Sequence, residues 1–322
     1  MDLYNIPGDT GHPWRLNKFL EYQHKAQSIP ENFVKVYAEW NTLSNDDRVF
    51  LTWLLTCTYN EITAILVFNL LDKTKTHNLD DFWRTHKPSL AFNSARLRVK
   101  SLDLFVGLLR DFLRVTGGNF EAWLKTFEGD YLGLEKALLG IKNVGRFSSE
   151  LFLETITTFG IWDFVEPPIY SENWEQNSNL TSALFNVFYL DEKAEAFDKT
   201  GKLDARDKSD LNDMLACVKS AILRAYNDPN EVTLGVNKLC SFRNLFKGTR
   251  YGGFHHDRQL ENLRGYERIY PEFSSLWAEL YAIRRDNYDA SLLGEVGGWN
   301  GVRKERKKLF LREGLTGVES IG

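Results

Sequence analysis

Apolar residues spaced at the period of an α-helix constrain this chain more than any other feature. From Leu102 to Leu113, apolar side chains recur three and four positions apart, which places them on one face of a helix. The same spacing recurs in segments spread along the chain, including 49–58, 62–71, 148–159, 211–226 and 273–284. Alternating apolar and polar residues, which would indicate β-strands, are scarce. The sequence therefore predicts an all-α fold.

Length and composition narrow the class of protein. The chain has 322 residues, enough for one large domain or two ordinary ones, and its 43% hydrophobic and 26% charged residues are typical of a globular protein. No run reaches the roughly 20 apolar residues of a membrane helix, and no secretory signal is visible. We therefore expect a cytoplasmic protein with no membrane partner. Cys57, Cys217 and Cys240 lack the spacing of a disulfide framework or a metal centre.

Two shifts in composition suggest how the chain is organised. The segment "EPPIYSENWEQNSN", from Glu166, is polar with two prolines and predicts a boundary. The segment "DKTGKLDARDKSD", from Asp198, is charged and nearly without apolar residues, so we interpret it as an exposed connection. The predicted parts are an N-terminal extension (1–30), a helical core (31–165) and a mainly helical C-terminal region (166–322).

A short turn in "GLEKALLGIKNVGRFSSELFLETI" carries the first functional signal. It joins two apolar helix-like runs and contains Gly140 and Gly145. Glycines let such a turn approach a phosphate, whose charge meets the amides at the start of the second helix. With a net charge of −4, nucleic-acid binding requires local positive charge. The predicted DNA-binding residues are Gly140, Lys142, Asn143, Gly145, Arg96 and Lys100. A turn that only packs two helices together has the same pattern.

The segments before this turn strengthen the DNA-binding interpretation. "FLTWLLTCTYNEITAILVFNLLD", "RLRVKSLDLFVGLLRDFLR" and "NFEAWLKTF" precede it in that order. The order and spacing of these segments and the turn resemble the core of the helix-hairpin-helix DNA glycosylase superfamily over roughly Phe50 to Val165. The resemblance implies a glycosylase-like helical core with its hairpin at 140–145, and it implies that Tyr59 and Asn60 face a base.

The chain departs from that superfamily where sugar chemistry takes place. Phe147 stands at the position of the lysine nucleophile of bifunctional glycosylases, and a phenyl ring has no nucleophilic atom. Asp163 and Glu166 both lie near the place of the expected acidic residue, and the sequence does not choose between them.

A second functional signal is "CSFRNLFKGTRYGGFHHDRQLENL". It gathers cations around a Tyr-Gly-Gly turn: Arg243, Lys247, Arg250 and Arg258. Cations placed together stabilise a polyphosphate or a leaving pyrophosphate. His255, His256 and Asp257 supply groups for a general base near neutral pH. A polar surface loop with capping residues is the alternative interpretation.

The glycosylase-like core together with "FRNLFKGTRYGGFHHDR" looks like the bacteriophage amino acid:DNA transferases, also described as α-glutamyl/putrescinyl thymine pyrophosphorylases. The resemblance implies a transferase that acts on double-stranded phage DNA in the host cytoplasm. In that DNA, 5-hydroxymethyluracil carries a pyrophosphate ester, which an amino acid or polyamine displaces. No cofactor is expected except Mg²⁺ that a pyrophosphate group brings with it.

The resemblance also implies roles for individual residues. The implied catalytic residues are Asp257, His255, His256 and Asp163. The implied substrate and pyrophosphate ligands are Lys247, Arg250, Arg258, Tyr59, Asn60 and Glu166. Two alternatives remain open at this point: a monofunctional DNA glycosylase, and a non-catalytic DNA-binding protein on the same scaffold.

Overall fold

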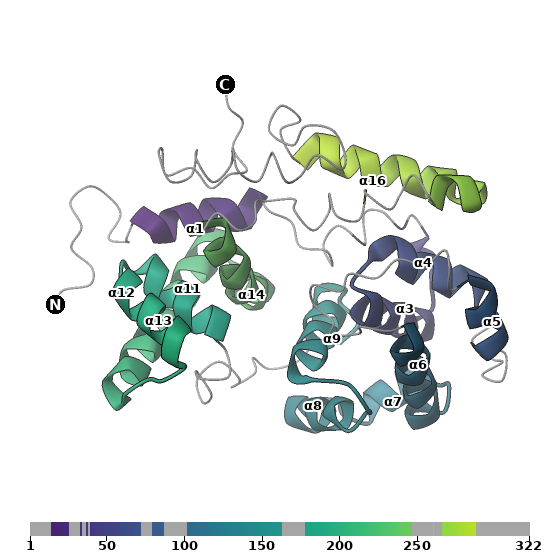
Figure 1. The fold of residues 1–322 in the computed structure, drawn as a ribbon, viewed down its shortest axis with the longest axis horizontal. Helices are drawn as coiled ribbons and strands as arrows, with labels where there is room; N and C mark the ends of the chain where they lie inside the picture. Colours follow the sequence, from purple (N-terminus) through teal and green to yellow (C-terminus); the bar gives the residue numbers. More distant parts are fainter. Residues whose placement is uncertain are drawn as a thin grey trace. The chain divides into compact units, whose positions relative to one another are not determined.

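The structure, a computed structural model, describes residues 14–25, 33, 37, 39–71, 79–86, 102–162, 178–246, 260 and 266–287 (Figure 1). The residues in these ranges are mainly helical and include no β-strand. The all-α prediction is therefore confirmed.

Two compact units share the chain. Unit 1 comprises Met1–Ser28, Pro168–Asp257 and Ile283–Gly322, and unit 2 comprises Ile29–Pro167 and Arg258–Ala282. The predicted core, 31–165, lies within unit 2, and most of the predicted extension, 1–30, belongs to unit 1. The predicted C-terminal region contributes to both units. Each unit is thus assembled from segments that are far apart in the sequence.

The helices of unit 2 surround α3. The elements are η1 (Trp40–Thr42), α3 (Asn45–Thr58), α4 (Glu61–Leu70), α5 (Leu79–His86), α6 (Leu102–Thr116), α7 (Phe120–Lys125), α8 (Tyr131–Leu139), α9 (Arg146–Thr158), η5 (Pro271–Phe273) and α16 (Ser274–Asn287), of which α16 continues beyond the unit. Four of them, α4, α6, α7 and α9, pack directly against α3 (Figure 1).

The position of α3 follows from its sequence. Every side chain from Val49 to Thr58 is buried, as expected for a helix that is apolar nearly all round. Aromatic rings fill the space around it: the Trp53 and Phe112 centroids are 4.1 Å apart, and those of Phe50 and Phe120 are 4.8 Å apart. These stacked pairs connect α3 with α6 and α7.

Side-chain caps fix where the helices around α3 begin. Ser44 accepts a hydrogen bond from the Asp47 amide at the start of α3. Asp46 accepts hydrogen bonds from the amides of Phe120 and Glu121, at 2.6 and 3.0 Å, and so holds the start of α7 against α3. The N-cap residue of α3, Ser44, and a residue of its first turn, Asp46, therefore stabilise the starts of two helices.

Unit 1 is a second helical assembly, built around α11. Its helices are α1 (Trp14–Lys25), α11 (Ser178–Val187), α12 (Asp191–Thr200), α13 (Ala205–Tyr226) and α14 (Pro229–Phe246). The other four helices all pack against α11, whose apolar side chains join the core of the unit. Arg15 on α1 forms an ion pair at 2.8 Å with Asp191, the first residue of α12, and so links α1 to a helix far away in the sequence.

The segment from Asp198 is mostly helical, although the sequence suggested an exposed connection. Only Gly201–Asp204 lies between α12 and α13. Asp204 and Asp207 form a capping box, in which each carboxylate accepts from the amide of the other residue. A capped and charged first turn has no apolar face, so hydrophobic spacing alone missed the start of α13.

Candidate nucleic-acid interface

The turn between α8 and α9, Gly140–Gly145, is the part of the predicted DNA-binding surface that the structure describes. Ile141 and Val144 are buried and anchor the turn to unit 2, whereas Lys142 and Asn143 are exposed. The Val144 amide donates to the Ile141 carbonyl at 3.0 Å and closes the turn. This α8–α9 turn thus combines an apolar attachment with a polar outer edge.

The left-handed backbone position of this turn is at an asparagine and not at either glycine. Asn143 takes the left-handed conformation, with φ of 69°, which asparagine tolerates better than most residues. Gly140 is helical, with φ of −72°, and Gly145 is extended, with φ of −98° and ψ of 170°. A Cβ atom added at Gly145 would meet nothing within 4 Å. Neither backbone angle nor internal packing therefore requires glycine at position 145.

The start of α9 has an unusual environment for a helix N-terminus. Side chains cap the starts of five other described helices: Ser44, Asn60, Asn119, Asp130 and Asp204. Helix α12 also lacks a side-chain cap, but its first turn has two acidic residues. Helix α9 begins at Gly145 with no side-chain cap, has no acidic residue in its first turn, and has Arg146 as its first residue. The N-terminal end of a helix favours negative charge. A bound anion would supply the negative charge and the hydrogen-bond acceptor that no side chain provides at the start of α9. Phe147 occupies the second position of this helix.

Arg146 has an acidic neighbour one turn along α9. Its Nε atom donates to Glu150 Oε1 at 2.8 Å, with the two side chains 26% and 24% exposed. Burial raises the pKa of the Glu150 carboxyl, the Arg146 guanidinium lowers it, and the Glu135 carboxylate raises it. The net charge beside the α8–α9 turn therefore depends on whether Glu150 is ionised, and burial disfavours the ionised form.

Tyr59 and Asn60, the predicted base-facing residues, lie at the junction of α3 and α4. Tyr59 ends α3 in the left-handed conformation, with φ of 45°, and is 7% exposed. Asn60 is 2% exposed, and its Oδ1 atom accepts a hydrogen bond from the Thr63 amide at 2.9 Å. Asn60 thus caps α4, and its role towards a base stays a prediction.

Buried polar side chains surround this junction. Thr58, Glu61 and Thr63 are each 0% exposed, and the Thr63 hydroxyl lies 3.0 Å from the hydroxyl of Tyr266. A carboxylate in such a position costs several kcal/mol unless other groups compensate its charge. Glu61 is therefore a candidate functional residue that the sequence interpretation missed. A glutamate in the first turn of a helix is normally explained by the helix dipole, so the sequence contains no distinguishing signal.

The other predicted site residues lie outside the described residues. They are Arg96, Lys100, Asp163, Glu166, Lys247, Arg250, His255, His256, Asp257 and Arg258. Arg243 is the one cation of the second signal within the described ranges. It forms an ion pair with Asp198 and donates to Asn179 Oδ1 at 2.6 Å, and its side chain is 9% exposed. Arg243 therefore connects α14 to α12 and α11 within unit 1.

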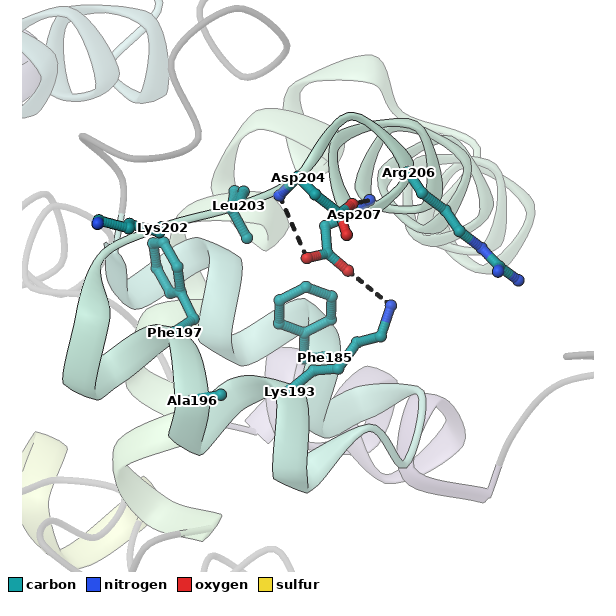
Figure 2. Close-up of a pocket in the computed structure, with 9 residues that line it drawn as sticks. All are labelled: Phe185, Lys193, Ala196, Phe197, Lys202, Leu203, Asp204, Arg206 and Asp207. Atoms are coloured by element: carbon teal, nitrogen blue, oxygen red, sulfur yellow. Dashed lines mark hydrogen bonds and ion pairs between the residues drawn. The ribbon is translucent and has the colours of Figure 1, made fainter.

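A cavity of about 440 Å³ lies between α12 and α13 (Figure 2). Figure 2 shows the Asp207 carboxylate between the Asp204 amide and the Lys193 ammonium group, which is 2.6 Å away, while Lys202 and Arg206 extend away from the centre. Helix capping and the Lys193 ion pair engage the two aspartates. We therefore do not assign the predicted chemistry to this cavity.

Two further observations concern the described ranges. No helix within them has the length and apolar character needed to cross a membrane. The same ranges contain no group of three or more His, Cys, Asp or Glu residues arranged to hold a metal ion.

Comparison of the chain with protein-family models, with curated proteins and with solved structures finds no match.

Proposed function

We propose that the protein is a DNA-modifying transferase. It binds double-stranded phage DNA and transfers an amino acid or a polyamine onto the pyrophosphate-activated methylene of 5-hydroxymethyluracil, releasing pyrophosphate. The wider proposal, DNA binding, rests on the α8–α9 turn. The narrower one, the reaction, rests on the sequence resemblance to the amino acid:DNA transferases.

The start of α9 is the observation that carries the DNA-binding proposal. Gly145 at the N-cap offers no side-chain oxygen to the first amides of α9, and Arg146 adds positive charge there. Both features favour a bound anion. Exposed Lys142 adds a cation within the same turn. Phosphate oxygens accept hydrogen bonds from backbone amides at helix N-termini, and such contacts hold DNA without reading its sequence.

The proposed reaction explains why a phenylalanine is tolerated at the lysine position. The amine nitrogen of the second substrate attacks the exocyclic methylene carbon and forms a C–N bond. The C–O bond breaks, pyrophosphate leaves with the bonding electron pair, and a base takes the proton from the nitrogen. The protein therefore needs a base pocket, cations and a proton acceptor, but no nucleophile of its own.

Each requirement has a proposed group. Tyr59 and Asn60 line the base pocket, and Lys247, Arg250 and Arg258 bind the leaving pyrophosphate. His255, His256 or Asp257 accepts the proton, and Asp163 or Glu166 binds the amino group of the donor. A flipped base would reach such a pocket from the duplex.

Mass spectrometry of nucleosides tests the proposal. Duplex DNA containing pyrophosphorylated 5-hydroxymethyluracil is incubated with the protein and a mixture of amino acids and polyamines, then digested. We expect a new nucleoside, heavier than thymidine by the mass of the donor less two hydrogens, together with released pyrophosphate. Free base and abasic DNA would instead identify a glycosylase. Unchanged DNA under tight binding would point to a non-catalytic DNA-binding protein.

A further inference from the structure

The Arg146–Glu150 ion pair lies beside the α8–α9 turn, and helix stability explains it poorly. Arg146 is the first residue of α9, where the helix dipole disfavours a cation. Along a helix, an acid four residues before a base stabilises more than the reverse order found here. A role outside helix α9 is therefore the better explanation for this pair.

Negative charge gathers around Arg146. Glu150 lies on the same helix, and the Glu135 carboxylate of α8 acts electrostatically on Glu150, while Tyr131 of α8 lies within range of all three charges as a neutral phenol. Burial raises the pKa of Tyr131, and the charges of Glu135 and Glu150 raise it further, while Arg146 lowers it. Arg146 is thus paired with Glu150, which itself lies within electrostatic range of Glu135, so the local charge opposes a phosphate as long as Glu150 is ionised.

We propose that Glu150 is the counter-ion that a DNA phosphate displaces from Arg146, so that Glu150 sets the affinity of the α8–α9 turn for DNA. This inference rests on the proposed function, in which the amides at the start of α9 meet a phosphate. Arg146 is the residue that follows the N-cap, so its side chain exchanges one anion for the other by a change of rotamer. Arginine binds phosphate through strong charge-assisted hydrogen bonds.

Binding to a short fluorescent DNA duplex, followed by anisotropy at low salt, tests the inference. Removing the negative charge with Glu150→Gln is expected to tighten DNA binding by about threefold or more. The matched control is Glu121→Gln on α7, which also breaks an ion pair four residues apart, between Glu121 and Lys125 at 2.9 Å. The control is expected to change the affinity by less than about twofold, because exposed pairs contribute little. Unchanged or weaker binding by Glu150→Gln would overturn the inference.

A double-mutant cycle shows whether Glu150 acts through Arg146. Arg146→Gln alone is expected to weaken DNA binding. Adding Glu150→Gln to that variant is expected to give no further change in affinity, because the charge on which Glu150 acts is already absent. A gain of the same size in both backgrounds would mean a general charge effect and would refute the exchange. Thermal melts of all variants establish that they are folded, and a glutamine at position 150 suits a site where burial disfavours charge.

The pH dependence gives a second, independent readout. The pKa of Glu150 is raised, so this carboxyl is neutralised at a higher pH than an ordinary glutamate, whose pKa is about 4.3. As pH falls from neutral towards that value, the affinity of the wild-type protein for DNA is expected to rise more than that of Glu150→Gln. Parallel pH profiles would contradict the inference. A wild-type protein that binds no duplex would remove the proposed function itself, whereas binding that ignores Glu150 would remove only the counter-ion role.

Discussion

At the scale of the residue, Gly145 separates what the fold requires from what a ligand requires. Its extended backbone suits any residue, and a Cβ atom there would meet nothing within 4 Å. The left-handed position of the turn belongs to Asn143, which was predicted to bind DNA but not to take this conformation, because asparagine is common in ordinary loops. Glycine patterns in a sequence therefore locate a turn without showing which residue bends it.

Gly145→Ala is expected to weaken DNA binding while leaving the protein folded. The added methyl group would stand between the first amides of α9 and a phosphate, and alanine stabilises the fold by up to about 1 kcal/mol through the unfolded state. Gly107→Ala on α6 is the control, because a Cβ atom there also meets nothing within 4 Å. Melting temperature and duplex affinity are measured for both. Equal affinity in all three proteins would argue against a phosphate at Gly145.

At the scale of the element, apolar spacing predicted helices with an exposed face and also the fully buried segment of α3, but it missed helices rich in polar residues. The segment 62–71 corresponds to α4, and the segment 211–226 lies within α13. Helix α11 was not predicted, because half of its residues are polar and three of them, Thr181, Ser182 and Asn186, are buried among the apolar ones, which obscures the apolar spacing. Within the candidate site, the place of the α8–α9 turn was predicted, but the missing cap and the Arg146–Glu150 pair depend on geometry.

Asn60 at the start of α4 allows capping to be tested apart from base recognition. Asn60→Ala removes the oxygen that accepts from the Thr63 amide and is expected to lower the free energy of unfolding by about 1 kcal/mol. Asn60→Ser retains a capping oxygen and is expected to keep most of that stability. If the carboxamide also contacts a base, the serine variant loses product formation despite its stability. Urea denaturation measures the stability of both variants, and the nucleoside assay measures their product formation. Full turnover by the serine variant would mean that Asn60 acts only as a helix cap.

At the scale of the whole molecule, contacts between distant segments of unit 1 give a structural role to Arg243, a cation of the second functional signal. Arg243 was grouped with the cations of "FRNLFKGTRYGG", yet it pairs with Asp198, whose carboxylate also accepts from the Ser182 hydroxyl at 2.6 Å. The sequence contains no sign of this contact, because Asp198 is 45 positions away and was assigned to an exposed connection. Contacts between distant segments are the part of the site that local patterns cannot predict.

Arg243→Met is expected to destabilise unit 1 selectively. The variant loses the charged hydrogen bonds of Arg243 to Asp198, whose side chain is 26% exposed, at a cost of about 2 kcal/mol. Hydrogen exchange should show lost protection in α11, α12 and α14, with α3 and α9 little changed. Arg206→Met, at an exposed position on α13, serves as the control. A uniform loss across both units would show that they unfold as one.

The hydroxyl contact between Thr63 and Tyr266 has a consequence for how the chain is made. These residues are 203 positions apart, so a ribosome releases α4 long before the side chain that covers it. Helices α11–α14 are synthesised in the interval. Most of the core of unit 1 is therefore made before the last segment of unit 2, Arg258–Ala282. A nascent chain that stops before Tyr266 would hold all of α3–α9 and yet expose buried hydroxyls at the junction of α3 and α4. The order of translation therefore makes the C-terminal segment the closing step in the folding of unit 2.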